Sequence, residues 1–406
     1  MRNFLRDANW LDEARIRRVS LLLLGIAILT TIWIIASSSG SLDVFGRPLG
    51  TDFSNVWSAG YMANEGRAGE AYDPILQHDA QRLIFGDPDV PFYGWHYPPF
   101  FLLAAALLAF LPYTLGWLAW MAVTLPAYVA VMGRLLQGRT ALFAALAFPP
   151  VAINFLHGQN GFLTAALIGG AMVCLNPRPW MAGVLIGLLA YKPQYGLLIP
   201  LVLLVGGHYR TFFSASLTVL TLCAISTLVF GMEIWLAFYE SRHFTQHHIL
   251  EAGSTGWYRI QSVFAATRMW GVSIPVAYAI QILLALSVVA GTVWVWASKT
   301  DFIWKASTLI SGSLLLTPYI LDYDLVAMAP AIALVAGYGL KHGFLPYEKA
   351  SLAFVWAAPF FARPAAEYLL IPLGFLSMMG LFLIVMRRCN VAIRQREADP
   401  GLLATA

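Results

Sequence analysis

The residues best suited to acid–base chemistry lie where apolar segments of this 406-residue chain end. Asp52 follows the first apolar segment, in the stretch Leu49-Gly50-Thr51-Asp52-Phe53. A carboxylate at the mouth of a membrane span can take a proton from a substrate that arrives from lipid. Asp52 is therefore the first candidate for a catalytic base. The alternative is that its side chain only caps the helix that begins near Phe53.

Other polar residues interrupt the apolar segments later in the chain, and ionisable groups near membrane depth are functional by default. Structural alternatives stay open: Lys192 can snorkel to lipid headgroups, the 157–160 group can satisfy a tight turn, and the two late aspartates can suit a helix N-terminus. The candidates for substrate binding are His96, Tyr97, His157, Gln159, Asn160, Lys192, Arg259, Tyr319, Asp322 and Asp324.

Two aspartate pairs have the D-x-D spacing that often holds a divalent ion with a nucleotide diphosphate. Asp87-Pro-Asp89 looks like a surface turn, and Asp322-Tyr323-Asp324 joins two apolar segments. The histidines at 243, 247 and 248 include an i,i+4 pair that could bind a metal ion on a helix. No third ligand lies nearby in the sequence, so we expect an interfacial role for these histidines. No phosphate-binding loop or dinucleotide fingerprint occurs. We therefore predict neither a metal site nor a cofactor.

The composition is that of a membrane protein that crosses the bilayer several times. Hydrophobic residues make up 59% of the chain and charged residues 11%, and the mean hydropathy is +0.69. The three cysteines have no metal-binding or disulfide-framework spacing. The net charge of +4 is interpreted as membrane topology, and no nucleic-acid partner is expected.

Hydropathy predicts an all-α bundle of about twelve transmembrane helices. The run 98–111 is too short and is expected to be re-entrant or interfacial. With the N-terminus inside, Lys and Arg then gather on the inner side, as the positive-inside rule requires. Asp and Glu divide the other way. The predicted spans are 19–37, 113–135, 140–155, 159–176, 179–191, 193–207, 211–231, 273–297, 303–319, 324–340, 348–361 and 366–386.

The whole chain, 1–406, is expected to form one integral-membrane domain with both termini in the cytoplasm. Residues 1–18 are predicted to form a cytoplasmic amphipathic helix, and 387–406 a cytoplasmic tail. The segment 38–97 is expected to be a long, juxtamembrane and helical first external loop with two amphipathic stretches, Asn55–Glu65 and Pro74–Phe85. The segment 232–272 is expected to be a second external loop.

Several separated motifs together resemble glycosyltransferase family 87, a family of GT-C-type membrane enzymes. They are Gly50-Thr51-Asp52-Phe53, Ala71-Tyr72-Asp73, His96-Tyr97-Pro98-Pro99 with Leu111-Pro112, His157-Gly158-Gln159-Asn160, Lys192-Pro193, and Pro318-Tyr319 followed by Asp322-Tyr323-Asp324. The resemblance covers roughly 19–385. Mycobacterial members have a His-containing pattern near the position of Asp322, from which this sequence departs.

The resemblance implies a GT-C fold and a polyprenyl-phosphate-linked sugar donor, typically the mannose form, used at the outer face of the cytoplasmic membrane. It matches Asp52 to the family's catalytic base. One base and direct displacement predict inversion at the anomeric carbon. Lys192 first, and Arg259 second, are expected to hold the departing phosphate. His96, Tyr97, Gln159 and Asn160 are expected to bind sugar hydroxyls, and the acceptor is a lipid or glycan.

Two other functions remain open. A transporter or flippase of a lipid-linked sugar suits twelve spans, although the two halves show no repeat and the charged groups crowd one face. A non-catalytic scaffold for envelope assembly leaves Asp52 and Lys192 without a role.

Overall fold

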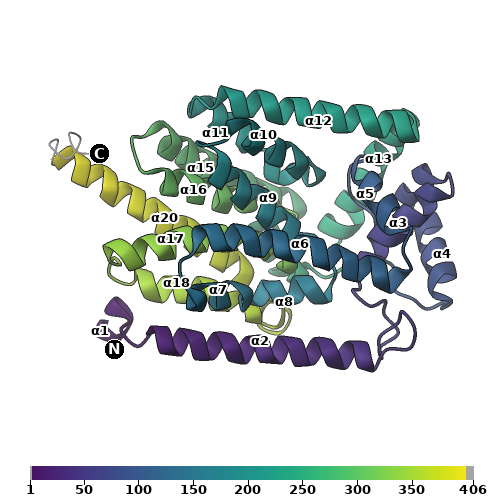
Figure 1. Cartoon of the computed structure of the whole chain (residues 1–406), viewed down its shortest axis with the longest axis horizontal. Coiled ribbons are helices and arrows are strands. Elements are labelled where there is room, and N and C mark those ends of the chain that lie inside the picture. The colour runs from purple at the N-terminus through teal and green to yellow at the C-terminus, as the bar shows by residue number, and fades with distance from the viewer. Residues whose placement is uncertain (1, 399–406) are drawn as a thin grey trace.

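In a computed structural model, residues 2–398 are described, and within them all regular structure is helical. The long helices run side by side, with α2, α6 and α12 along the long axis of the molecule (Figure 1). The helices long and apolar enough to cross a membrane are α2 (Glu13–Ala36), α6 (Tyr113–Leu135), α12 (Tyr209–Phe230), α15 (Ile274–Ala297), the pair η6 (Asp322–Met328) with α17 (Ala329–His342), and α20 (Leu373–Ala398).

The predicted count of twelve spans is not confirmed. Six helices of the described chain have the length and composition to cross, or seven if α7 (Arg139–Leu146) and α8 (Pro149–Leu156), bent by 49°, form one broken span. Other predicted spans are shorter apolar helices, namely α9 (Gly161–Cys174), α10 (Pro179–Leu188) with η2 (Leu189–Tyr191), η3 (Pro193–Gly196) with α11 (Ile199–Val205), and α16 (Phe302–Leu316).

The shortfall has a physical cause, because apolar composition reports burial as well as membrane crossing. Helix α9 has 14 residues, which at 1.5 Å per residue gives about 21 Å, less than a hydrocarbon core of about 30 Å. Most of α9 and α16 is buried among other helices. Their hydrophobic residues therefore build the centre of the bundle.

The first loop folds into helices, as predicted. Its two amphipathic stretches form α3 (Phe53–Asn64) and α4 (Pro74–Phe85), joined by η1 (Ala68–Tyr72). The short apolar run forms only α5 (Phe101–Leu108), eight residues long. It packs tightly on α3, since a Cβ on Gly60 would lie 2.0 Å from the Ala105 carbonyl oxygen.

The second loop and the chain ends complete the molecule. Helices α3, α4, α5 and α13 gather at one end of the bundle, while the N-terminus and the last described turns of α20 lie at the other (Figure 1). Residues 399–406 of the predicted tail lie outside the described residues. The remaining elements are α1 (Arg2–Asp7), α13 (Glu233–Phe244), the π-helical η4 (Thr245–Glu251), η5 (Trp257–Arg259), α14 (Val263–Met269), α18 (Glu348–Ala357), η7 (Ala358–Phe361) and α19 (Ala362–Leu369).

At the N-terminal end, Asp12 caps α2 by accepting a hydrogen bond from the Arg15 backbone N–H at 2.7 Å. Charged residues 13–18 thus form the first turns of the same helix that carries the first span. The tail residues up to Ala398 likewise continue α20 beyond its apolar part.

Candidate active site

Asp52 lies in a tight turn directly before α3. Gly50 has a φ of +72° and Thr51 a φ of +23°, so the chain reverses sharply before the helix begins. The Asp52 carboxylate makes no capping hydrogen bond to α3, which removes the capping alternative. Its Oδ2 instead accepts a hydrogen bond from Gln159 Nε2 at 3.2 Å and lies 3.8 Å from His157 Nδ1.

Close backbone packing brings the 157–161 turn against this carboxylate. Gly158 has a φ of +58°, and a Cβ there would lie 2.6 Å from the Phe53 Cβ. A Cβ on Gly161 would lie 2.7 Å from the Tyr323 carbonyl oxygen. Glycine at both positions therefore lets one turn touch two distant segments, those that carry Asp52 and Asp322.

His157 lies at the centre of this contact. Its Nδ1 is 2.7 Å from the Thr51 hydroxyl, and its Nε2 is 3.3 Å from a guanidinium nitrogen of Arg363. Burial lowers the pKa of His157 to about 4; the Asp52 carboxylate opposes the shift, while Arg363 and Arg259 reinforce it. The imidazole is therefore neutral at physiological pH.

Gln159 is fixed by donors on its other side. Tyr97 donates from its hydroxyl to Gln159 Oε1 at 3.2 Å, and the Asn160 backbone N–H donates to the same oxygen at 3.3 Å. Because Oε1 accepts twice, the amide must turn Nε2 toward Asp52. Tyr97, Gln159 and Asp52 form one hydrogen-bonded chain. The side chain of Asn160 is buried at the start of α9.

Arg363, on α19, is part of the site although sequence reasoning missed it. Its guanidinium forms an ion pair with the Asp322 carboxylate, with one contact at 3.1 Å. Asp322 is nearly inaccessible to solvent, while 31% of the Arg363 side chain is exposed. The available signal was position: residue 363 falls between the last two predicted spans, in a connection expected on the same outer face as the other polar groups.

Lys192 is buried in an ion pair with Asp324. Its Nζ lies 2.5 Å from Asp324 Oδ1, and each side chain is 5% exposed. Asp324 Oδ2 also accepts the Leu321 backbone N–H at 3.1 Å. The cation lies 5.8 Å from the ring centres of Tyr195 and Tyr323. The lysine charge is thus neutralised inside the protein and does not face an open surface.

Three other predicted site residues make no hydrogen bond or ion pair with Asp52 among the described residues. His96 Nδ1 lies 2.9 Å from the Thr245 hydroxyl, which ties the first loop to the second. The backbone N–H of Tyr319 donates to its neighbour Thr317 at 3.1 Å. Arg259 is exposed, and its positive charge acts on the pKa of His157. Arg259 is therefore an accessible cation near the carboxylate.

The D-x-D pairs and histidines do not form a metal centre among the described residues. No group of three potential His, Cys, Asp or Glu ligands is found in 2–398. Asp87 accepts the Asp89 backbone N–H at 2.8 Å, as in the predicted surface turn. His247 pairs with Glu251 at 2.8 Å and stacks on His243.

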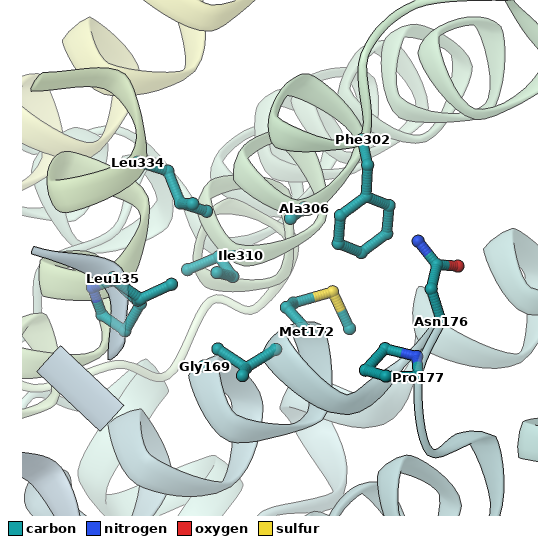
Figure 2. A pocket seen from close by; sticks show the side chains of 11 residues that line it. Leu135, Gly169, Met172, Asn176, Pro177, Phe302, Ala306, Ile310 and Leu334 are labelled. Atoms are coloured by element: carbon teal, nitrogen blue, oxygen red, sulfur yellow. The ribbon is translucent and has the colours of Figure 1, made fainter. Parts of the chain in front are cut away.

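An apolar cavity of about 200 Å³ lies away from these residues, between α6, α9, α16 and α17 (Figure 2). Gly169 and Met172 line it from the half of α9 opposite to Gly161, and Asn176 supplies an amide at its rim (Figure 2). No titratable group lines it. It therefore has no part in chemistry at Asp52.

A second hollow of about 240 Å³ lies between η5 and α19. Trp257, Tyr258 and Glu367 are among its lining residues. Glu367 follows Arg363 by about one helical turn on α19. The same helix therefore carries one residue of this hollow and one residue of the cluster of Asp52, His157, Asp322 and Arg363.

Comparison with known proteins gives one match. The sequence profile described as glycosyltransferase family 87 matches residues 95–318, which is more than half of the chain. No curated protein and no solved structure matches. The matched region holds Tyr97, His157, Gln159 and Lys192, while Asp52, Asp324 and Arg363 lie outside it.

Proposed function

The chain belongs to glycosyltransferase family 87 and is therefore a membrane enzyme that transfers sugar; from that premise we propose a donor, a face and a mechanism. The donor is a polyprenyl-phosphate-linked hexose, with mannose as the expected sugar. The acceptor is a hydroxyl of a lipid or glycan. The reaction takes place at the outer face of the cytoplasmic membrane, with both termini inside.

One observation carries the mechanism: Asp52 has one engaged and one open oxygen. Oδ2 is held by Gln159 and lies beside His157, while within 2–398 no hydrogen bond reaches Oδ1. The side chain is 20% exposed. A carboxylate that is held at one oxygen, unbonded at the other and partly exposed suits a general base, because its geometry is set before the acceptor binds.

In the proposed step Asp52 takes the proton of the acceptor hydroxyl. The acceptor oxygen forms a bond to the anomeric carbon as the bond from that carbon to the phosphate oxygen breaks. The electron pair leaves with the polyprenyl phosphate. Because attack and departure take place on opposite faces, a β-linked donor gives an α-glycoside.

The leaving phosphate needs positive charge or hydrogen-bond donors. Arg259 is exposed, and the partly exposed guanidinium of Arg363 lies within the same cluster. Guanidinium groups bind phosphate by paired N–H donors. We therefore assign the phosphate to Arg259 and Arg363, and the buried Lys192–Asp324 pair to holding the segment at 322–324 in place. With charge supplied this way, EDTA should leave the rate unchanged.

The test is transfer by the purified protein in nanodiscs from radiolabelled polyprenyl phosphate mannose to a total lipid extract. The expected result is a labelled glycolipid whose new linkage is α by NMR. A β-linkage contradicts inversion. Transfer only from another polyprenyl phosphosugar would show that the donor sugar is not mannose. Movement of labelled donor across the bilayer without any new glycoside favours a flippase.

A further inference from the structure

The contact between Arg363 and His157 fixes where the imidazole proton lies. We propose that Arg363, held by Asp322, locks His157 in its neutral Nδ1–H tautomer and thereby positions Thr51 and Asp52 for proton transfer. His157 acts here as a positioning residue, since it acts through Asp52, and Arg363 orients His157 in addition to its proposed contact with the phosphate. The inference rests on the proposed role of Asp52 as the base.

A guanidinium is a donor only. Arg363 Nη2 lies 3.3 Å from His157 Nε2, and every hydrogen-bonding atom of the guanidinium carries N–H bonds. Nε2 must therefore accept, and it cannot carry a proton of its own. In a neutral imidazole the single proton is then on Nδ1.

The proton on Nδ1 points at the turn that carries Asp52. Nδ1–H donates to the Thr51 hydroxyl oxygen at 2.7 Å, and Asp52 Oδ2 lies 3.8 Å from the same nitrogen. In the opposite tautomer, a lone pair on Nδ1 would point toward the Asp52 carboxylate. The Nε2–H would then face an N–H of Arg363. With Nδ1–H in place, the Thr51 hydroxyl keeps its own proton for another acceptor.

Asp322 makes the arrangement rigid. It pairs with Arg363, and its Oδ1 also accepts the Tyr323 backbone N–H at 2.9 Å. Buried charge pairs with several hydrogen bonds hold one geometry well. The chain Asp322–Arg363–His157–Thr51 thus reaches the turn that carries Asp52 through partners other than Tyr97 and Gln159.

Two substitutions of His157 distinguish the effect of its tautomer from the effect of its size. In His157→Asn the amide nitrogen can take the place of Nδ1 and donate to Thr51, whereas in His157→Gln the amide extends to the place of Nε2. We expect kcat of His157→Asn to exceed that of His157→Gln by at least about tenfold, since a wrong tautomer can lower kcat by about 10⁴-fold. Equal rates, or the reverse order, overturn the proposal.

A direct measurement does not need turnover. Histidine ¹⁵N NMR of the protein in nanodiscs, with the His157 signal identified by its loss in His157→Asn, should show the Nδ1–H tautomer. Arg363→Lys should shift that signal, and Arg242→Lys, an exposed arginine of the same end, should not. A wild-type Nε2–H tautomer overturns the proposal, whether or not Arg363→Lys folds. If no donor is accepted at all, the tautomer still decides this inference apart from the proposed function.

Discussion

At the scale of single residues, the state of each buried acid depends on its partner. Asp322, Asp324 and Glu348 each face a cation, namely Arg363, Lys192 and Arg388. Asp52 has no Lys or Arg in direct contact within 2–398, and its neighbours are the neutral side chains of Gln159 and His157. The Asp52 carboxylate is therefore not committed to an ion pair, and it is available to a substrate hydroxyl.

The pH response follows from two histidines. Burial lowers the pKa of His96 and of His157 to about 4, whereas the unfolded chain takes up these protons near pH 6.5. Between those values the unfolded state binds more protons, so stability falls as pH drops from about 6.5 to 4. We expect thermal stability to fall over this range, with a smaller fall in His96→Gln/His157→Asn.

The same pKa values predict that the activity does not change with pH through the titration of these histidines near pH 6.5. A plot of kcat/KM against pH should be free of an inflection near 6.5, because His157 is already neutral there. An inflection near 6.5 that disappears in His157→Asn would contradict the account.

At this scale, sequence reasoning named part of the candidate site. Asp52, Tyr97, His157 and Gln159 were predicted and do lie together. Whether Lys192 was buried in an ion pair could not be predicted, because pairing with Asp324 depends on how segments 132 positions apart pack. Arg363 lay beyond the motifs considered, and only the tertiary contact with Asp322 identifies it.

At the scale of elements, the position of Asp52 depends on the close approach of the turn 157–161 to the turn 50–53. We predict that Gly158→Ala lowers kcat by about 10²-fold, since its Cβ would lie 2.6 Å from the Phe53 Cβ and displacements near 1 Å cost about that much. The matched control is Gly66→Ala, which has the same backbone requirement, φ +77°, but nothing within 4 Å of the new Cβ. Equal losses in both variants would show that backbone strain, and not the contact, is responsible.

The buried pair Lys192–Asp324 joins the short helices η2 and η3 to the start of η6. Removing one partner leaves an unpaired buried charge, which costs about 3–5 kcal/mol. Lys192→Met should therefore lower thermal stability strongly, and the double variant Lys192→Met/Asp324→Leu should regain most of it. Purely additive losses would contradict the pairing. Activity of the double variant then tests the original expectation that Lys192 serves the donor phosphate.

Hydropathy predicted the positions of the helices better than it predicted which of them cross the membrane. The predicted span 113–135 coincides with α6, and the two amphipathic stretches became α3 and α4. The predicted spans near α9 and α16 are helices too, but both are short and largely buried. The burial of α9 is not visible in composition, because lipid-facing and protein-facing apolar residues look alike. The bend between α7 and α8 falls at Pro149-Pro150, inside the predicted span 140–155.

At the scale of the whole molecule, the loop helices α3, α4, α5 and α13 lie at the end of the bundle opposite to the N-terminus and the last described turns of α20 (Figure 1). From the positive-inside rule we predict that the loop helices lie outside. In a variant without Cys174, Cys223 and Cys389, Ser254→Cys in the second loop should react with an impermeant maleimide on intact cells. Gln137→Cys, also exposed, should react only after permeabilisation. The reverse pattern would invert the proposed topology.

The central claim is that Asp52 is the base of a glycosyl transfer. The most direct test compares wild type, Asp52→Asn and Asp79→Asn in the nanodisc assay with labelled polyprenyl phosphate mannose. Asp79 is an exposed acid of the same loop, and it pairs with Arg82 at the surface. We predict that Asp52→Asn lowers kcat by about 10²–10⁴-fold with an unchanged melting profile, and that Asp79→Asn transfers like wild type. Transfer by Asp52→Asn at the wild-type rate would contradict the mechanism.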